Sequence, residues 1–185
     1  MKKDKYLDKA ITLFKKEGVS MPIEVIAEKM GVSKKTLYNN FESKDGLIEQ
    51  CMESVLNDLV EKMECFTDEN IAPEECFIAG INVLRLFFKE SSPFFLKDML
   101  TLYPNLTSNE HTTGYELFVE KLQSHIARGQ KKAVYRNDID SNLMARYISY
   151  SIFGYYKNYV MTEGQYTTDH YFNQVINYNL KALKY

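Results

Sequence analysis

Five polar residues between Ser33 and Phe41 carry the groups in this chain that are best suited to recognising a partner. They are Lys34, Lys35, Thr36, Tyr38 and Asn39, which supply two cations, two hydroxyls, an amide and an aromatic ring. Leu37 and Phe41 lie four residues apart, so on a helix they pack inward and leave these polar side chains outward. Positive charge and hydrogen-bond donors on one helix face fit a polyanion such as nucleic acid.

The residues around this segment predict the helices that position it. Ile23, Ile26, Ala27 and Met30 recur at helical spacing, Gly31 can adopt the positive φ that ends a helix, and Ser33 can cap the next one. Residues 21–47 therefore predict a helix-turn-helix. A preceding helix over residues 5–16 has an apolar stripe, and we expect it to form a small core with Ile26, Met30, Leu37 and Phe41.

Residues 21–47 resemble the DNA-binding signature of the tetracycline-repressor (TetR) family. The matching positions are Ile26-Ala27, Gly31-Val32-Ser33, Thr36-Leu37-Tyr38, Phe41, Ser43-Lys44-Asp45 and Leu47. The resemblance implies a sequence-specific transcriptional regulator, most simply a repressor that a small-molecule effector releases from double-stranded operator DNA. Contacts to bases or the groove are then expected from Lys34, Lys35, Thr36 and Asn39, and contacts to phosphates from Ser33, Tyr38 and Lys44.

The segment departs from the family pattern at two places. Met21-Pro22 stands where many members have a Thr or Ser that starts the first motif helix and contacts a phosphate, so one hydroxyl contact is missing, although Pro22 suits a helix start. Lys35 stands where many members have a glycine, which adds a positive charge near DNA. Lys44 lies in the first turn of the next helix, where free N–H groups and a lysine together favour a phosphate.

The sequence of the whole chain predicts an all-α fold with about nine helices. We assign residues 1–47 to a three-helix DNA-binding domain and residues 48–185 to an effector-binding and dimerisation domain. The helices expected after residue 42 cover 43–66, 73–89, 93–103, 112–132, 141–161 and 168–184. The segment 73–89 is nearly all apolar and predicts a helix covered on all sides. By resemblance, the last two helices form a homodimer interface; Leu143, Tyr147, Tyr150, Ser151 and Gly154 line one side of the first.

A binding site for the effector is the second candidate function. Fourteen tyrosines and eleven phenylalanines are present, most of them after residue 60. Apolar cavities with a few polar groups are typical of ligand sites, and an aromatic or amphipathic effector would suit this composition. The residues expected to line the site are Phe77, Leu84, Phe88, Met99, Phe118, Leu122, His125, Tyr147 and Tyr150. The alternatives are a core that uses Phe in place of Leu and a histidine satisfied by its own surroundings.

Composition excludes several other classes of protein. The net charge is −2, but residues 1–47 hold ten lysines against seven acidic residues, so this part carries +3 and the remainder −5. The charged N-terminus and the lack of a long apolar run indicate a cytoplasmic protein without membrane segments. The cysteines at positions 51, 65 and 76 fit neither a disulfide framework nor a zinc site.

No catalytic motif is present, so we expect no enzyme and no cofactor. Two other classes stay open. One is a helical small-molecule-binding protein or enzyme that does not bind DNA, and the other is an architectural DNA-binding protein that responds to no effector.

Overall fold

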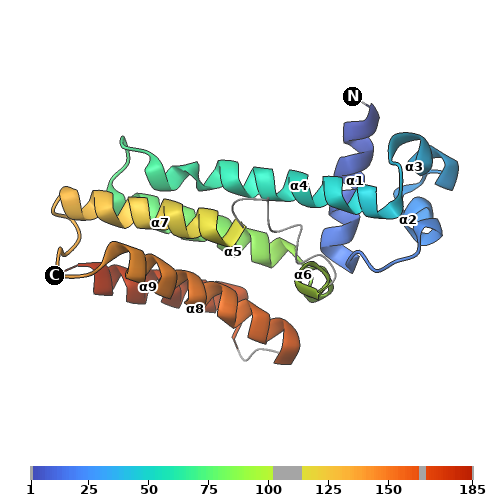
Figure 1. Ribbon diagram of the computed structural model, residues 1–185. Helices are drawn as coiled ribbons and strands as arrows, with labels where there is room; N and C mark the ends of the chain where they lie inside the picture. The colour runs from blue at the N-terminus through green and yellow to red at the C-terminus, as the bar shows by residue number, and fades with distance from the viewer. Residues whose placement is uncertain (1, 102–113, 163–165, 185) are drawn as a thin grey trace. The chain divides into compact units, whose positions relative to one another are not determined.

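The computed structural model describes residues 2–101, 114–162 and 166–184, and all regular secondary structure in this part of the chain is helical (Figure 1). It contains nine α-helices and one short 3-10 helix, which confirms the expected all-α fold. In chain order they are α1 (Lys2–Glu17), α2 (Ile23–Met30), α3 (Lys34–Asn40), α4 (Lys44–Lys62), the 3-10 helix η1 (Met63–Thr67), α5 (Pro73–Glu90), α6 (Pro93–Thr101), α7 (Gly114–Lys131), α8 (Ser141–Thr162) and α9 (Thr168–Leu183).

The chain folds into two compact units. The first unit comprises residues 1–58 and 90–107, and so contains α1 to α3, most of α4, and α6. The second unit comprises residues 59–89 and 108–185, and so contains η1, nearly all of α5, and α7 to α9. The first unit is thus built from two separate stretches of sequence. The division at residue 47 into DNA-binding and effector-binding parts concerns function and stays a prediction.

The first unit has a small apolar core with well-formed helix ends. Ile26, Met30, Leu37 and Phe41 are buried, as the sequence predicted, together with Phe14 of α1. Gly31 ends α2 in the left-handed conformation at φ 68°, where its N–H bonds back to the helix. A side chain other than glycine rarely adopts this φ, so the residue type itself helps to end α2 and turn the chain toward α3.

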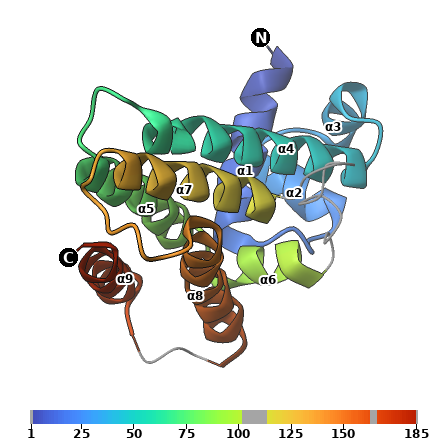
Figure 2. The same cartoon turned by 60° about the vertical axis from the view of Figure 1, so that its left-hand side comes forward.

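The second unit is built around α7, which packs against η1 and α8, while α8 also packs against α9 (Figure 2). Phe66 and Phe118 meet edge to face with ring centroids 5.9 Å apart, and both are fully buried. Two glycines let rings approach a helix closely: Gly80 faces Phe66 and Gly129 faces Tyr135. Aromatic rings thus fill space that glycine leaves open beside the helix backbone.

Two details differ from the sequence prediction. The helix expected over 43–66 becomes 3-10 after Lys62. At that end, the Phe66 and Asp68 carbonyls accept hydrogen bonds from Arg128 of α7 instead of from a following helical turn. The expectation that 73–89 is covered on all sides is wrong within this chain, because Ile78 and Leu86 of α5 are exposed. The apolar composition of α5 therefore predicts more burial than the helix has within the single chain.

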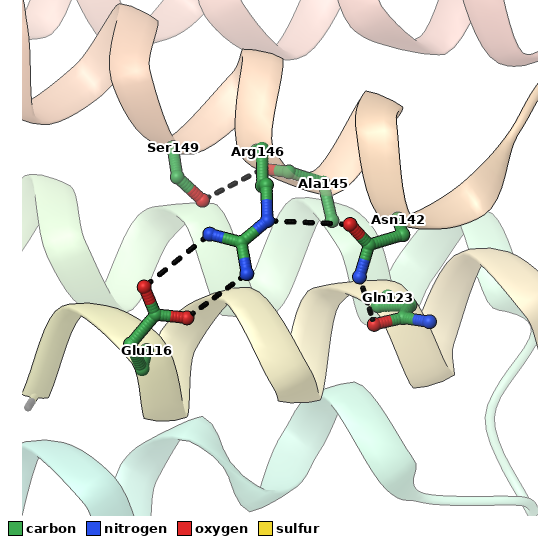
Figure 3. Close-up of polar contacts among 6 residues, drawn as sticks. All are labelled: Glu116, Gln123, Asn142, Ala145, Arg146 and Ser149. Atoms are coloured by element: carbon green, nitrogen blue, oxygen red, sulfur yellow. Dashed lines mark hydrogen bonds and ion pairs between the residues drawn. The ribbon is translucent and has the colours of Figure 1, made fainter. Parts of the chain in front are cut away.

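A row of polar contacts joins α7 to α8 (Figure 3). Arg146 binds both carboxylate oxygens of Glu116 at 3.2 and 3.3 Å, and its Nε donates to Asn142 at 3.2 Å. Asn142 in turn donates to Gln123 at 2.8 Å. The hydrogen bond to Glu116 raises the pKa of the Arg146 guanidinium above its usual value. These contacts fix the rotation of α8 about its axis, and so decide which of its side chains face outward.

Within the described ranges, no helix is both long enough and apolar enough to cross a membrane.

Candidate nucleic-acid interface

The helix α3 begins with a well-formed cap. The Ser33 backbone is extended at φ −78° and ψ 152°, and its Oγ accepts a hydrogen bond from the Thr36 N–H at 3.0 Å. The Ser33 and Thr36 hydroxyls also lie 2.8 Å apart, within hydrogen-bonding distance. Since each hydroxyl has one proton and two lone pairs, both keep further hydrogen-bonding capacity toward a partner. The cap thus places two hydroxyls at the start of α3.

The outward face of α3 carries the polar groups that the sequence predicted. Lys34, Lys35, Tyr38 and Asn39 are exposed, whereas Leu37 is buried in the core of the first unit. The neighbouring Asn40 is different, because its side-chain amide donates to the Thr36 carbonyl of its own helix at 2.7 Å. The exposed face therefore presents two cations, one ring and one uncommitted amide.

Lys34 is held by a partner on the other helix of the motif. Its ammonium group forms a hydrogen-bonded ion pair with Glu24 of α2, and it lies 5.9 Å from the centre of the Tyr38 ring. The hydrogen bond to Glu24 raises the pKa of Lys34, and the same bond lowers the pKa of Glu24. A phosphate or base that binds Lys34 must therefore displace a carboxylate from it.

Replacing Glu24 by glutamine is expected to strengthen DNA binding. The substitution removes the carboxylate that competes for Lys34, and an exposed pair of this kind predicts a gain of roughly two- to fivefold in affinity. Fluorescence anisotropy with labelled duplexes measures this effect. Glu28→Gln is the matched control, because it removes the same charge from an exposed position of α2. Equal gains for the two variants would mean that net charge alone, and not the release of Lys34, determines the result.

Lys44 lies in the first turn of α4, next to the Ser43 cap. The Ser43 Oγ accepts the Gly46 N–H at 2.9 Å, which confirms the predicted cap. Lys44 is half-buried at this position. An N-terminal turn with a lysine suits a phosphate oxygen because the free N–H groups and the ammonium charge favour an anion together. The phosphate role of Lys44 stays a proposal.

One surface feature of the first unit was missed by sequence reasoning. An open groove of about 560 Å³ lies between α1 and α2, and four lysines are among the residues that line it: Lys5, Lys9, Lys16 and Lys29. Lys29 is paired with Glu17 at 2.7 Å, and Lys9 donates to the Met30 carbonyl at 3.1 Å. Only the packing of α1 on α2 could reveal this groove.

The predicted effector residues differ in burial and belong to two different units. Phe77, Leu84, Phe118, Leu122 and His125 have no exposed surface, and Phe88 is almost completely buried in the same unit. Met99 lies on α6 and belongs to the first unit. Tyr147 and Tyr150 point outward, with 64% and 66% of their surface exposed. The face of α8 that packs inward carries Ala145, Ile148, Ser149, Ile152 and Tyr156 instead.

His125 is satisfied by its own surroundings. Its Nδ1 lies 3.1 Å from the Phe66 carbonyl oxygen and its Nε2 lies 3.0 Å from the Tyr135 hydroxyl. That hydroxyl is also 3.0 Å from the carbonyl oxygen of Pro73, so its single proton serves one of two acceptors at a time. Burial lowers the pKa of His125 to about 4, which leaves the imidazole neutral near pH 7. The alternative of a locally satisfied histidine therefore describes His125 better than a free ligand-binding group.

Comparison with known proteins agrees with this arrangement. Residues 7–51 match the model of the bacterial regulatory proteins of the tetR family. A TetR transcription regulator from Haloarcula marismortui shares the fold with a TM-score of 0.80 at 18% identity, over 99% of this chain and 98% of that one. PfmR from Thermus thermophilus gives 0.66 at 20% identity, over 97% and 99%. The fatty acid degradation regulator FadR from Bacillus halodurans gives 0.68 at 17% identity, over 97% and 94%.

No curated protein matches the chain in sequence. The helix-turn-helix with its capped, polar α3, followed by a larger set of helices, defines a DNA-binding regulator. The family match makes the identification specific for residues 7–51, which form a DNA-binding domain of the TetR family of transcriptional regulators. The fold of the whole chain is that of solved TetR-family regulators. Members of this family are not enzymes, in agreement with the expectation from the sequence.

Proposed function

We propose that this protein represses transcription as a homodimer and that a small-molecule effector releases it from operator DNA. The observation that carries the proposal is the exposed face of α3, where Lys35, Tyr38 and Asn39 extend from a capped helix whose opposite side is buried. Two such helices in a homodimer would enter successive major grooves if they lie about 34 to 36 Å apart or a multiple of that. A change in this spacing lowers the affinity without any covalent chemistry.

The contacts divide into two kinds. Lys34, Lys35, Thr36 and Asn39 are proposed to contact bases or the groove, because Lys pairs with guanine and Asn with adenine in the major groove. Ser33, Tyr38 and Lys44 are proposed to contact phosphates, which fix the register of the protein on DNA. Of these residues, only Lys34 is held in an ion pair with another helix in the free chain. Lys35 and Asn39 can therefore contact bases without first breaking such a pair.

The effector is proposed to be aromatic or amphipathic. The interior of the second unit is rich in rings, as in the stacked pair Phe88 and Tyr156, whose centroids are 3.7 Å apart. Because Phe77, Phe118 and Leu122 are fully buried, an effector that reaches them must part helices that are packed in the free chain. Binding would therefore select a second conformation of the second unit, which is how a ligand shifts an equilibrium between two states.

A titration of the full chain against duplexes tests the proposed function. Promoter-derived and random duplexes are compared at two salt concentrations, because phosphate contacts make the affinity fall with salt whereas base contacts create preference. A salt-dependent preference for one duplex supports the regulator. Binding of every duplex with equal affinity would identify an architectural protein, and no DNA binding would leave a small-molecule-binding protein.

The outward face of α8 supports the proposed homodimer. Leu143, Tyr147 and Tyr150 follow one stripe of the helix and are all more than half exposed in the single chain. On α9 the stripe Phe172, Val175, Asn179 and Leu183 is buried within the chain, so it is already used for packing. A stripe of large apolar side chains on α8 is therefore available to a second copy, as the family resemblance implies.

Replacing Tyr147 by glutamate is expected to weaken the dimer. Placing an unpaired charge in an apolar interface costs about 1–3 kcal/mol or more, which corresponds to roughly tenfold to a hundredfold weaker association. Sedimentation velocity over a range of concentrations measures it. Leu86→Glu is the control, because Leu86 is also an exposed apolar residue but lies on α5. Loss of the dimer in the control alone would place the interface on α5 and not on α8.

A further inference from the structure

The turn between α1 and α2 is held by a side chain from α6. The Asp98 Oδ2 accepts the Val19 N–H at 2.7 Å and the Ser20 N–H at 3.2 Å, and its Oδ1 is 3.0 Å from the Ser20 hydroxyl. All three residues belong to the first unit. The sequence analysis placed Asp98 in the effector-binding domain, 78 residues away from the turn that it contacts.

The turn needs this acceptor because of how α1 ends. Gly18 has a φ of 82°, and its N–H bonds to the Phe14 carbonyl at 2.8 Å, so the two N–H groups that follow point away from the helix. Val19 is buried, and a buried N–H without a partner costs about 1–3 kcal/mol. A carboxylate accepts both N–H groups with one oxygen and the hydroxyl with the other. The fit is close, since a Cβ at Gly18 would lie 2.6 Å from the Asp98 Oδ2.

A second set of contacts joins the start of α6 to α1. The Ser92 N–H donates to the Lys15 carbonyl at 2.7 Å, which occupies a carbonyl in the last turn of α1. Glu90, the last residue of α5, lies 3.6 Å from the Lys15 ammonium group. The end of α1 and the turn after it are thus held by three residues of the segment 90–98, namely Glu90, Ser92 and Asp98. Since α2 starts at Ile23, three residues after Ser20, the direction of α2 depends on this turn.

We infer that Asp98 is a positioning residue for DNA binding, which holds the α1–α2 turn so that α2 and α3 keep the orientation that reads a sequence. The inference rests on the proposed function, since it assigns a role in the same DNA contact. Asp98 itself contacts no nucleic acid and acts through the backbone N–H groups of Val19 and Ser20 and through the Ser20 hydroxyl. Within the first unit, α6 then supports DNA recognition together with α1 to α4.

The test uses full-length Asp98→Ala and Asp98→Asn, with Glu28→Ala as a charge control on α2. The probes are a duplex that the wild-type chain selects from a random pool and a scrambled duplex of the same length. Asp98→Ala is expected to weaken binding of the selected duplex at least tenfold and to change binding of the scrambled duplex less than twofold. Asp98→Asn is expected to recover most of this loss, because an amide oxygen can accept the N–H groups and the NH₂ can donate to the Ser20 hydroxyl.

The charge of Asp98 and its contacts predict opposite changes in DNA affinity when Asp98 is replaced by alanine. Removing a negative charge from a DNA-binding unit should by itself strengthen binding to every duplex. Tighter or unchanged binding by Asp98→Ala would overturn the positioning role, and so would an equal loss in Asp98→Asn. If the wild-type chain selects no duplex at all, the proposed function fails together with this inference. If the wild type selects a duplex and Asp98→Ala selects it equally well, only the inference fails.

Folding is monitored separately. Thermal unfolding followed by circular dichroism shows whether Asp98→Ala remains folded at the temperature of the titration. Should it unfold, Ser20→Ala provides a milder variant that removes only the hydroxyl contact to Oδ1. A several-fold loss of selected binding is then expected in Ser20→Ala, and wild-type selectivity in this variant would contradict the role of the contact.

Discussion

Gly129→Ala is expected to destabilise the second unit strongly. A Cβ at position 129 would lie 2.0 Å from Cδ2 and 2.4 Å from Cε2 of Tyr135. The ring cannot move aside, because Tyr135 is fully buried and its hydroxyl contacts both Pro73 and His125. Overpacking of this kind costs about 1–3 kcal/mol or more, which exceeds the gain of about 1 kcal/mol from replacing glycine in a helix.

The measurement is thermal or urea unfolding, with Gly154→Ala as the control. Gly154 lies in α8 with no atom of the single chain within 4 Å of an added Cβ, so alanine there should raise the stability of the monomer by up to about 1 kcal/mol. A net loss of about 2 kcal/mol at Gly129 would lower the melting temperature by roughly 4–8 °C for a chain of this size. Equal stabilities of the two alanine variants would show that the Tyr135 ring can be displaced.

Asn39→Ala is expected to relax sequence preference, whereas Lys44→Ala is expected to weaken binding to all duplexes. An asparagine that reads a base contributes about 1–3 kcal/mol of discrimination, so the preferred duplex should lose roughly fivefold to a hundredfold. Loss of one phosphate contact lowers the affinity for preferred and random duplexes alike, and reduces the slope of log K against log salt by about 1. Anisotropy titrations at several salt concentrations separate the two effects.

Matched substitutions guard against a general loss of folding. Asn57→Ala removes an exposed amide from α4, and Lys131→Ala removes an exposed charge from α7. Both controls should bind DNA as the wild type does. Asn39 would not recognise a base if Asn39→Ala preferred the selected duplex over random duplexes as strongly as the wild type does. The assignment of phosphate contacts would be wrong if Lys44→Ala and Tyr38→Phe both left the affinity and its salt slope unchanged.

The helix-turn-helix could be predicted from sequence because its determinants are local. Gly31 ends α2, Ser33 caps α3 within three residues, and Leu37 with Phe41 repeats the helical spacing of a buried side. Each of these signals acts over one or two turns, so it requires no knowledge of what packs against it. The helix predicted between Ser33 and Phe41 therefore agrees with α3 (Lys34–Asn40).

The rotation of α8 could not be predicted in the same way. Aromatic and aliphatic residues lie on both of its sides, so its periodicity does not distinguish Tyr147 and Tyr150, which face outward, from Ile148 and Ile152, which face inward. The choice is made by side chains of α7, as in the contact between Glu116 and Arg146. The contribution of α6 to the first unit was missed for a related reason, because it depends on contacts between residues about 80 positions apart.

The discontinuous first unit has a consequence for engineering. The order of the sequence alone would place the junction of a hybrid regulator directly after the helix-turn-helix. In this chain a junction at residue 47 would transplant the α1–α2 turn without the carboxylate that caps it, and would leave Asp98 facing a foreign turn. A graft that keeps residues 1–58 and 90–101 together would transfer the helix-turn-helix with the α6 residues that contact it. The transferable module is therefore defined by contacts and not by sequence order.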